Sequence, residues 1–208
     1  MTTVDPPAEA VAVAERYARI ERPVTVGVAM AIGILGGAAV IVLPLLWGLV
    51  VALGLLALAR VPAFQSGGRT RLRVDEAPEA VRDAFVGPTP PPLALQWGVA
   101  DEVRVDGEDA VYDVSYLFGL RSVEMRVATE LVDDRVELTV TTDGQPWGTY
   151  TARIESGDEG TEVTVEVDSD RKFGLRRLPQ HLVARRYRDA AIEAQGYEVV
   201  ERSFSLSR

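Results

Sequence analysis

The 208-residue sequence contains no cysteine, no asparagine, one histidine (His181) and one lysine (Lys172). Without cysteine the chain has no disulfide and no thiolate metal site. A single histidine leaves no second imidazole or thiol for a zinc centre or a nucleophilic dyad. The sequence also lacks the common nucleotide-binding, hydrolase and metalloprotease motifs. We therefore expect no catalytic residue, no metal and no cofactor, and we expect His181 to be solvent-exposed.

Lysine is scarce in a chain whose net charge is −9. Residues before position 63 carry four Arg and four acidic residues, so the whole negative excess lies after that point. An acidic composition that uses Arg instead of Lys is typical of halophilic proteins, whose acidic surfaces maintain solubility in very salty cytoplasm. An ordinary acidic protein from a high-GC genome is the alternative. The acidic balance argues against nucleic-acid binding, which depends on neutralising phosphates.

Charge is also missing from a long apolar run, in which the thirty-seven residues from Pro23 to Ala59 contain no charged side chain. One helix of this length would extend ~55 Å, whereas a bilayer hydrocarbon core is ~30 Å thick. Pro44 can break such a helix. The sequence therefore predicts two membrane spans, Val24–Val42 and Leu45–Val61. A signal peptide is excluded because a head of more than twenty residues with four acidic side chains precedes the run.

Basic residues flank this predicted transmembrane hairpin and are absent from its turn. They are Arg16, Arg19 and Arg22 before it, and Arg60, Arg69, Arg71 and Arg73 after it. Since positive residues stay on the cytoplasmic side, we expect a multi-pass protein of the cell membrane with both termini in the cytoplasm. Ala29, Gly33 and Gly37 recur every four residues, which permits close packing of the two spans or a homodimer.

Residues 1–22 contain an apolar stripe at helical spacing, formed by Val11, Ala14, Tyr17 and Ala18. The stripe predicts a short cytoplasmic amphipathic helix. Two arrangements are open: the helix lies on the membrane surface, or it extends the first span.

After a linker at 63–68 the apolar residues change to a period of two, which is typical of strands. A strand at 71–74 and a short helix from Pro78 precede six alternating strands between residues 99 and 167. One face of these strands is apolar and the other is charged, which indicates an antiparallel meander. A long helix follows at 178–195, and the tail after Gly196 is either a strand or poorly ordered. The predicted fold class is α+β.

The segments 70–85 (TRLRVDEAPEAVRDAF), 160–167 (GTEVTVEV) and 178–194 (LPQHLVARRYRDAAIEA) resemble the START/Bet v 1-like superfamily, also called SRPBCC or polyketide cyclase-like. The resemblance covers about residues 69–196. It implies a helix-grip fold, in which a curved antiparallel sheet wraps around the long C-terminal helix and leaves an apolar cavity. The chain departs from that pattern by its tail of about a dozen residues and its N-terminal membrane segment.

A cavity between the sheet and the helix would suit a lipid or another hydrophobic small molecule. The alternative is ordinary core packing, because apolar strand faces are buried by default. The residues expected to line such a pocket are Tyr112, Tyr116, Phe118, Met125, Leu138, Tyr150, Ile154, Val165, Tyr187 and Ala191.

A basic patch interrupts the acidic domain. It comprises Arg171, Lys172, Arg176, Arg177, Arg185, Arg186 and Arg188, with no acid among them. Two interpretations are open: the patch contacts anionic lipid headgroups, or it pairs with the acidic sheet. At multimolar salt the Debye length is ~3 Å or less, so only direct arginine–phosphate contacts would persist.

The sequence thus predicts four segments: an amphipathic helix (1–22), a two-span hairpin (23–62), a linker (63–68) and a START-like domain (69–208). The predicted function is non-catalytic binding of an apolar or lipid ligand at the cytoplasmic membrane surface. The alternative is a structural or protein-partner module with a filled core, and a START-like cyclase or hydrolase is the third hypothesis.

Overall fold

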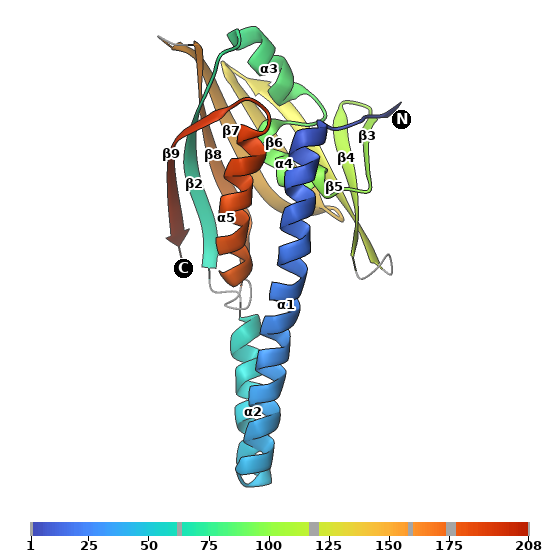
Figure 1. The fold of residues 1–208 in the computed structure, drawn as a ribbon, viewed down its shortest axis with the longest axis vertical. Helices are drawn as coiled ribbons and strands as arrows, with labels where there is room; N and C mark the ends of the chain where they lie inside the picture. Colours follow the sequence, from blue (N-terminus) through green and yellow to red (C-terminus); the bar gives the residue numbers. More distant parts are fainter. Residues whose placement is uncertain (1, 62–63, 117–120, 158–159, 174–177, 208) are drawn as a thin grey trace.

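The computed structural model describes residues 2–61, 64–116, 121–157, 160–173 and 178–207 of the chain. It describes side chains in these ranges except at positions 22, 25, 60, 64–66, 116, 121, 170–173, 178–182 and 204–207. The described residues form an α+β domain from which an apolar helical stalk projects (Figure 1).

Nine strands of the described residues form a single antiparallel sheet in the order β1-β3-β4-β5-β6-β7-β8-β2-β9. The strands are β1 (Thr2–Thr3), β2 (Phe64–Val74), β3 (Glu102–Asp106), β4 (Asp109–Tyr116), β5 (Arg121–Val132), β6 (Arg135–Thr142), β7 (Gln145–Gly157), β8 (Gly160–Phe173) and β9 (Glu198–Ser207). The meander from β3 to β8 follows the predicted alternation. The tail is a strand, because β9 pairs with β2 at the sheet edge.

The helices are α1 (Ala8–Val42), α2 (Leu45–Arg60), α3 (Pro78–Val86), α4 (Ala94–Gly98) and α5 (Leu178–Glu193), with a 3₁₀ turn η1 at Pro91–Leu93. In Figure 1, α5, α4 and the first half of α1 lie together over one face of the sheet, while α3 lies at the end far from the stalk. An amphipathic sheet needs such a cover to bury its apolar face.

The first half of α1 belongs to the core of the sheet domain. Ala10 and Ala14 are completely buried, and Tyr17 stacks at a tilt on Tyr187 of α5 with ring centroids 5.9 Å apart. Of the two arrangements open for residues 1–22, the helical extension is therefore correct. The apolar stripe faces the domain and not a membrane surface. The sheet is therefore covered by α1 as well as by the C-terminal helix α5.

The second half of α1 and all of α2 form the stalk. The helical break lies at Leu43–Pro44, as predicted, and α2 packs back along α1. Of the described helices, α1 alone is long and apolar enough to cross a membrane, while α2 has 16 residues. Length and composition therefore support one crossing helix rather than the predicted pair, and the second span stays a prediction.

The contact between α1 and α2 uses small residues other than those expected on α1. A Cβ atom added at Gly48 would lie 2.6 Å from the Cα atom of Val40, so only glycine fits at this crossing. A Cβ atom at Gly36 would meet Ala52 at 3.5 Å. A Cβ atom at Gly33 or Gly37 would meet no atom within 4 Å, so these two glycines face away from α2.

Candidate functional site

The interior between the sheet and its helices is the predicted ligand site, and most of its described residues form a packed core. Six of the ten predicted lining residues are buried, and they are Tyr112, Leu138, Tyr150, Ile154, Val165 and Ala191. Met125 and Tyr187 are half-buried. The side chain of Tyr116 and the whole of Phe118 lie outside the described part of the chain.

The segment η1–α4 belongs to the hydrophobic core and contacts α1 and α5. Leu93 and Trp97 are completely buried there, and the indole Nε1 of Trp97 donates a hydrogen bond to the carbonyl oxygen of Pro90 at 3.0 Å. Gly98 meets α1 so closely that an added Cβ atom would lie 2.6 Å from the Cβ atom of Ala14. Sequence reasoning missed the position of this segment in the core. The apolar residues that follow the proline run were the available signal.

The tyrosine hydroxyls in this interior are held by structural partners. The Tyr112 hydroxyl donates to the carbonyl oxygen of Pro88 at 2.9 Å, and burial raises the pKa of Tyr112. Burial also raises the pKa of Tyr150, while the charge of Arg188 and a hydrogen bond with Gln96 lower it. Neither neighbour of Tyr150 is an acid, so the pairing of a tyrosine hydroxyl with a carboxyl group that a cyclase or hydrolase would need is missing from these contacts.

Burial of tyrosines makes the domain sensitive to alkaline pH. Burial and the nearby Glu76 raise the pKa of Tyr197 to about 12. The unfolded chain loses this proton near pH 10, so the stabilisation is complete below pH ~10 and is lost as pH rises toward 12. We expect the free energy of unfolding to fall between pH 9 and 12, and to fall less in Tyr197→Phe. Denaturant titrations at several pH values measure this free energy. The prediction is contradicted if the free energy of unfolding falls equally with pH in the wild type and in Tyr197→Phe.

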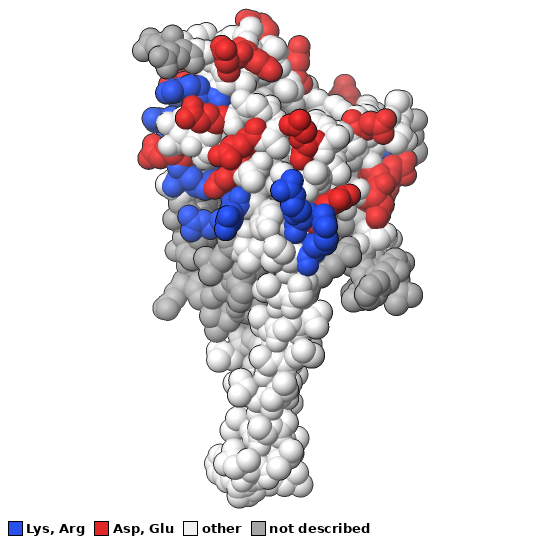
Figure 2. Space-filling view, viewed as in Figure 1, with Lys and Arg blue, Asp and Glu red and all other residues white. Residues whose placement is uncertain are grey.

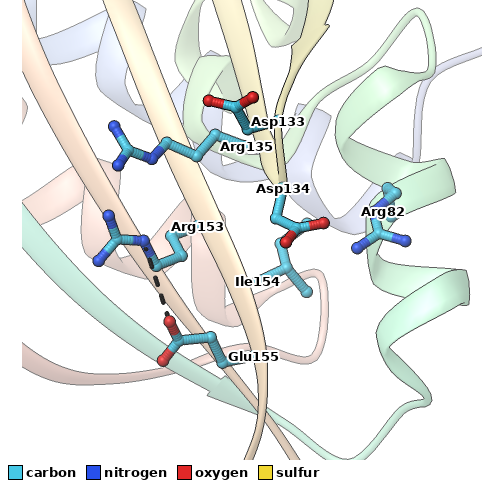
Figure 3. Close-up of a pocket in the computed structure, with 7 residues that line it drawn as sticks. All are labelled: Arg82, Asp133, Asp134, Arg135, Arg153, Ile154 and Glu155. Carbon is cyan, nitrogen blue, oxygen red and sulfur yellow. Dashed lines mark ion pairs between the residues drawn. The ribbon is translucent and has the colours of Figure 1, made fainter.

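A surface hollow of about 330 Å³ lies at the end of the sheet beside α3, away from the predicted interior (Figure 3). Its lining residues are Arg82, Asp133, Asp134, Arg135, Arg153, Ile154 and Glu155. Three arginines face three acids, so the lining has no net charge. Arg153 pairs with Glu155 at 3.9 Å, and both point away from Arg82 in Figure 3. The polar groups do not converge on one point as a binding site for a small ligand would require.

The predicted basic patch is only partly within the described residues. Arg185 and Arg186 are exposed on α5, and Arg188 is half-buried. The side chains of Arg171 and Lys172, and the whole of Arg176 and Arg177, lie outside the description, as does the side chain of His181. The structure adds a residue that sequence reasoning missed, because Arg202 of β9 forms an ion pair with Asp189 on α5.

Charged residues on the outer face of the sheet pair with residues one or two strands away. Arg126 of β5 donates to Asp106 and Asp109 at 3.2 Å each, and these hydrogen bonds raise the pKa of its guanidinium group. Arg104 of β3 donates to Glu124 at 2.8 Å. Within the described residues, no group of three His, Cys, Asp or Glu side chains is placed to hold a metal ion. The outer face is therefore a solvated surface with paired charges.

No family model matches the chain, and no curated protein matches it. A conserved Geobacillus kaustophilus protein of known structure is similar with a TM-score of 0.44 and 13% identity, over 62% of this chain and 91% of that one. A Rhodobacter sphaeroides protein gives 0.44 and 16%, over 63% and 90%. The siderocalin Ex-FABP, described as having dual ligand specificities, gives 0.20 and 12%, over 71% and 95%. Similarity at this level establishes no family and no function, so the START-like resemblance stays a prediction.

Proposed function

We propose that the chain is a membrane-anchored, non-catalytic binding module, whose stalk inserts into the bilayer and holds the sheet domain at the cytoplasmic surface. The observation that carries this proposal is the continuity of α1. One half of this helix packs one face into the domain, and the other half exposes large apolar side chains, with Ile34 69% and Ile41 85% exposed. An apolar surface of this extent is unstable in water and is typical of a membrane contact.

The dimensions of the stalk agree with insertion. The nineteen residues of α1 from Val24 to Val42 extend ~28 Å, close to the ~30 Å of a hydrocarbon core. The sixteen residues of α2 extend ~24 Å, so the return span requires a thinned bilayer or a tip that stays within the far leaflet. Arginines flank both ends of the apolar run and none lies at its turn, which supports the proposal that both termini are cytoplasmic.

The packed interior favours a protein partner over an enclosed ligand. Trp97 and the first half of α1 occupy the region in which a lipid would be held. Lipid binding is the second candidate, and the half-buried state of Met125, Trp147 and Tyr187 favours it. A second copy of the chain is one protein partner that fits. In the stripe of Ala29, Gly33 and Gly37, both glycines face away from α2, where they can pack closely against another helix.

Arginine substitutions in the stalk test the anchor. An arginine at the centre of a membrane span costs ~2.5–3.5 kcal/mol on insertion scales. We expect Ile34→Arg with Leu49→Arg to reduce strongly the fraction of full-length protein that stays in membranes during alkaline carbonate extraction. Val86→Arg, which replaces an exposed apolar residue of α3, is the matched control and should remain bound. Equal extraction of wild type and both variants would exclude insertion.

A further inference from the structure

The end of the sheet domain at which the stalk begins carries exposed arginines on two helices. Contact between Tyr17 and Tyr187 places α1 and α5 side by side at this level. Arg16 and Arg19 therefore lie at about the same height as Arg185 and Arg186, and all four are exposed. In Figure 2, the charged groups nearest the uncharged stalk on the face shown are basic. We call Arg16, Arg19, Arg185 and Arg186 the collar.

We propose that the collar binds the phosphate groups of anionic lipids in the leaflet that the stalk enters. This inference rests on the proposed membrane anchorage and names the partner of the domain's lower surface. It extends the basic patch read from residues 171–188, because α1 supplies half of the collar.

The height of the collar matches the headgroup layer. At 1.5 Å per residue, Arg19 lies ~6 Å and Arg16 ~10 Å along α1 from Pro23, where the apolar run begins. The headgroup region extends ~5–8 Å beyond the hydrocarbon core on each side. Arg16 and Arg19 each donate Nε to a backbone carbonyl of their own helix, at 3.2 and 3.5 Å. Long arginine side chains at this height reach lipid phosphates.

The charge balance at this level is positive although the domain as a whole is acidic. The acids on the same parts of α1 and α5 are Glu15, Glu21 and Asp189, and Asp189 pairs with Arg202. The arginines on these parts of the two helices are the four of the collar and Arg188, so five positive charges face three negative ones, which leaves +2. Arg185 and Arg188 lie close enough to Arg202 to lower the pKa of its guanidinium group, together with its burial. This excess of positive charge favours a bound anion.

Arginine binds a lipid phosphate better than lysine, whose ammonium group acts as a point charge. A guanidinium group donates two parallel hydrogen bonds to phosphate oxygens, and such contacts persist where salt screens long-range attraction. A membrane surface also presents many phosphates in one plane, which matches a collar spread over two helices.

The test uses the full-length protein in mixed micelles of phosphatidylglycerol and phosphatidylcholine at equal amounts, with retained lipids counted by native mass spectrometry. We expect the wild type to retain phosphatidylglycerol preferentially. Each arginine near an anionic surface contributes ~1 kcal/mol, or about fivefold. Arg185→Gln with Arg186→Gln should therefore lower the preference about 25-fold. Arg82→Gln with Arg153→Gln, which removes the same charge beside the membrane-distal hollow, should leave it unchanged.

Two further measurements keep the outcomes distinct. If the α5 variant fails to fold by circular dichroism, Arg16→Gln with Arg19→Gln replaces it and should give the same loss. The proposed role of the collar is overturned if the wild type shows no preference for phosphatidylglycerol. It is also overturned if the collar variants and the control variant lose that preference equally. In that case carbonate extraction still reports on the anchor, since a chain that inserts without selecting lipid refutes the collar alone, whereas a chain that does not insert refutes the proposed function.

Discussion

Replacing Ala14 by Asp is expected to destabilise the sheet domain strongly, although position 14 lies far in sequence from α4, the helix that it meets at Gly98. Ala14 is completely buried where α1 meets α4. Its Cβ atom lies so close to Gly98 that neither position has room for a larger side chain. A carboxylate at this site would be buried without a partner, which places the substitution among those that cost more than about 4 kcal/mol. Many domains have a total stability of only ~5–15 kcal/mol.

Ala12→Asp is the matched control for this prediction. Ala12 is exposed on the same helix, two residues away, so the same charge there should change stability by ~0.5 kcal/mol or less. Denaturant unfolding of the full-length protein in a mild detergent, followed by tryptophan fluorescence, measures both variants. If Ala14→Asp and Ala12→Asp have equal stabilities, the first half of α1 does not pack into the domain. The expected result would mean that the anchor helix and the domain fold as one unit.

Replacing Trp97 by Ala is expected to be the second most disruptive change, at ~3–5 kcal/mol. The indole ring is completely buried and is oriented by its hydrogen bond to Pro90. Removing it leaves an apolar cavity between the sheet and the helices, in the region where a ligand site was predicted. Such a cavity binds small apolar molecules. We therefore expect indole to raise the melting temperature of Trp97→Ala and to leave the wild type unchanged.

The control for this substitution is Trp147→Ala. Trp147 stacks on Tyr150 with ring centroids 6.2 Å apart but is only half-buried, so a smaller loss is expected. Native mass spectrometry of the wild type after lipid extraction provides the second measurement. An apolar ligand retained in the wild-type interior would contradict the packed core and favour the lipid-binding candidate. A loss below ~1 kcal/mol in Trp97→Ala would show that the ring does not fill the core.

Much of the fold could be predicted because its signals are local. The meander from β3 to β8, the helix at Pro78 and the break at Leu43–Pro44 each follow from residue spacing or from proline within a short window. The edge strand β9 could not be assigned because its apolar alternation fits either a strand or a loose tail. Its pairing with β2 joins residues 125 to 142 positions apart.

The candidate site was predicted less well than the fold. The apolar faces of β4, β6 and β7 are the same whether a ligand or other side chains cover them, so Tyr112, Leu138 and Tyr150 were placed in a pocket. Their burial against η1–α4 depends on how Pro88, Pro90 and the residues after them return across the sheet. No local pattern specifies that path.

The sequence alone determined that thirty-seven consecutive residues carry no charge, that an acidic α+β domain follows them, and that the chain has no cysteine and a single histidine. Only the tertiary structure decided what covers each apolar surface. The stripe on α1 predicted that something must pack there, and the structure supplies α4, α5 and the sheet. Periodicity records that a face is apolar, whereas its partner is set by packing between segments that are distant in the chain.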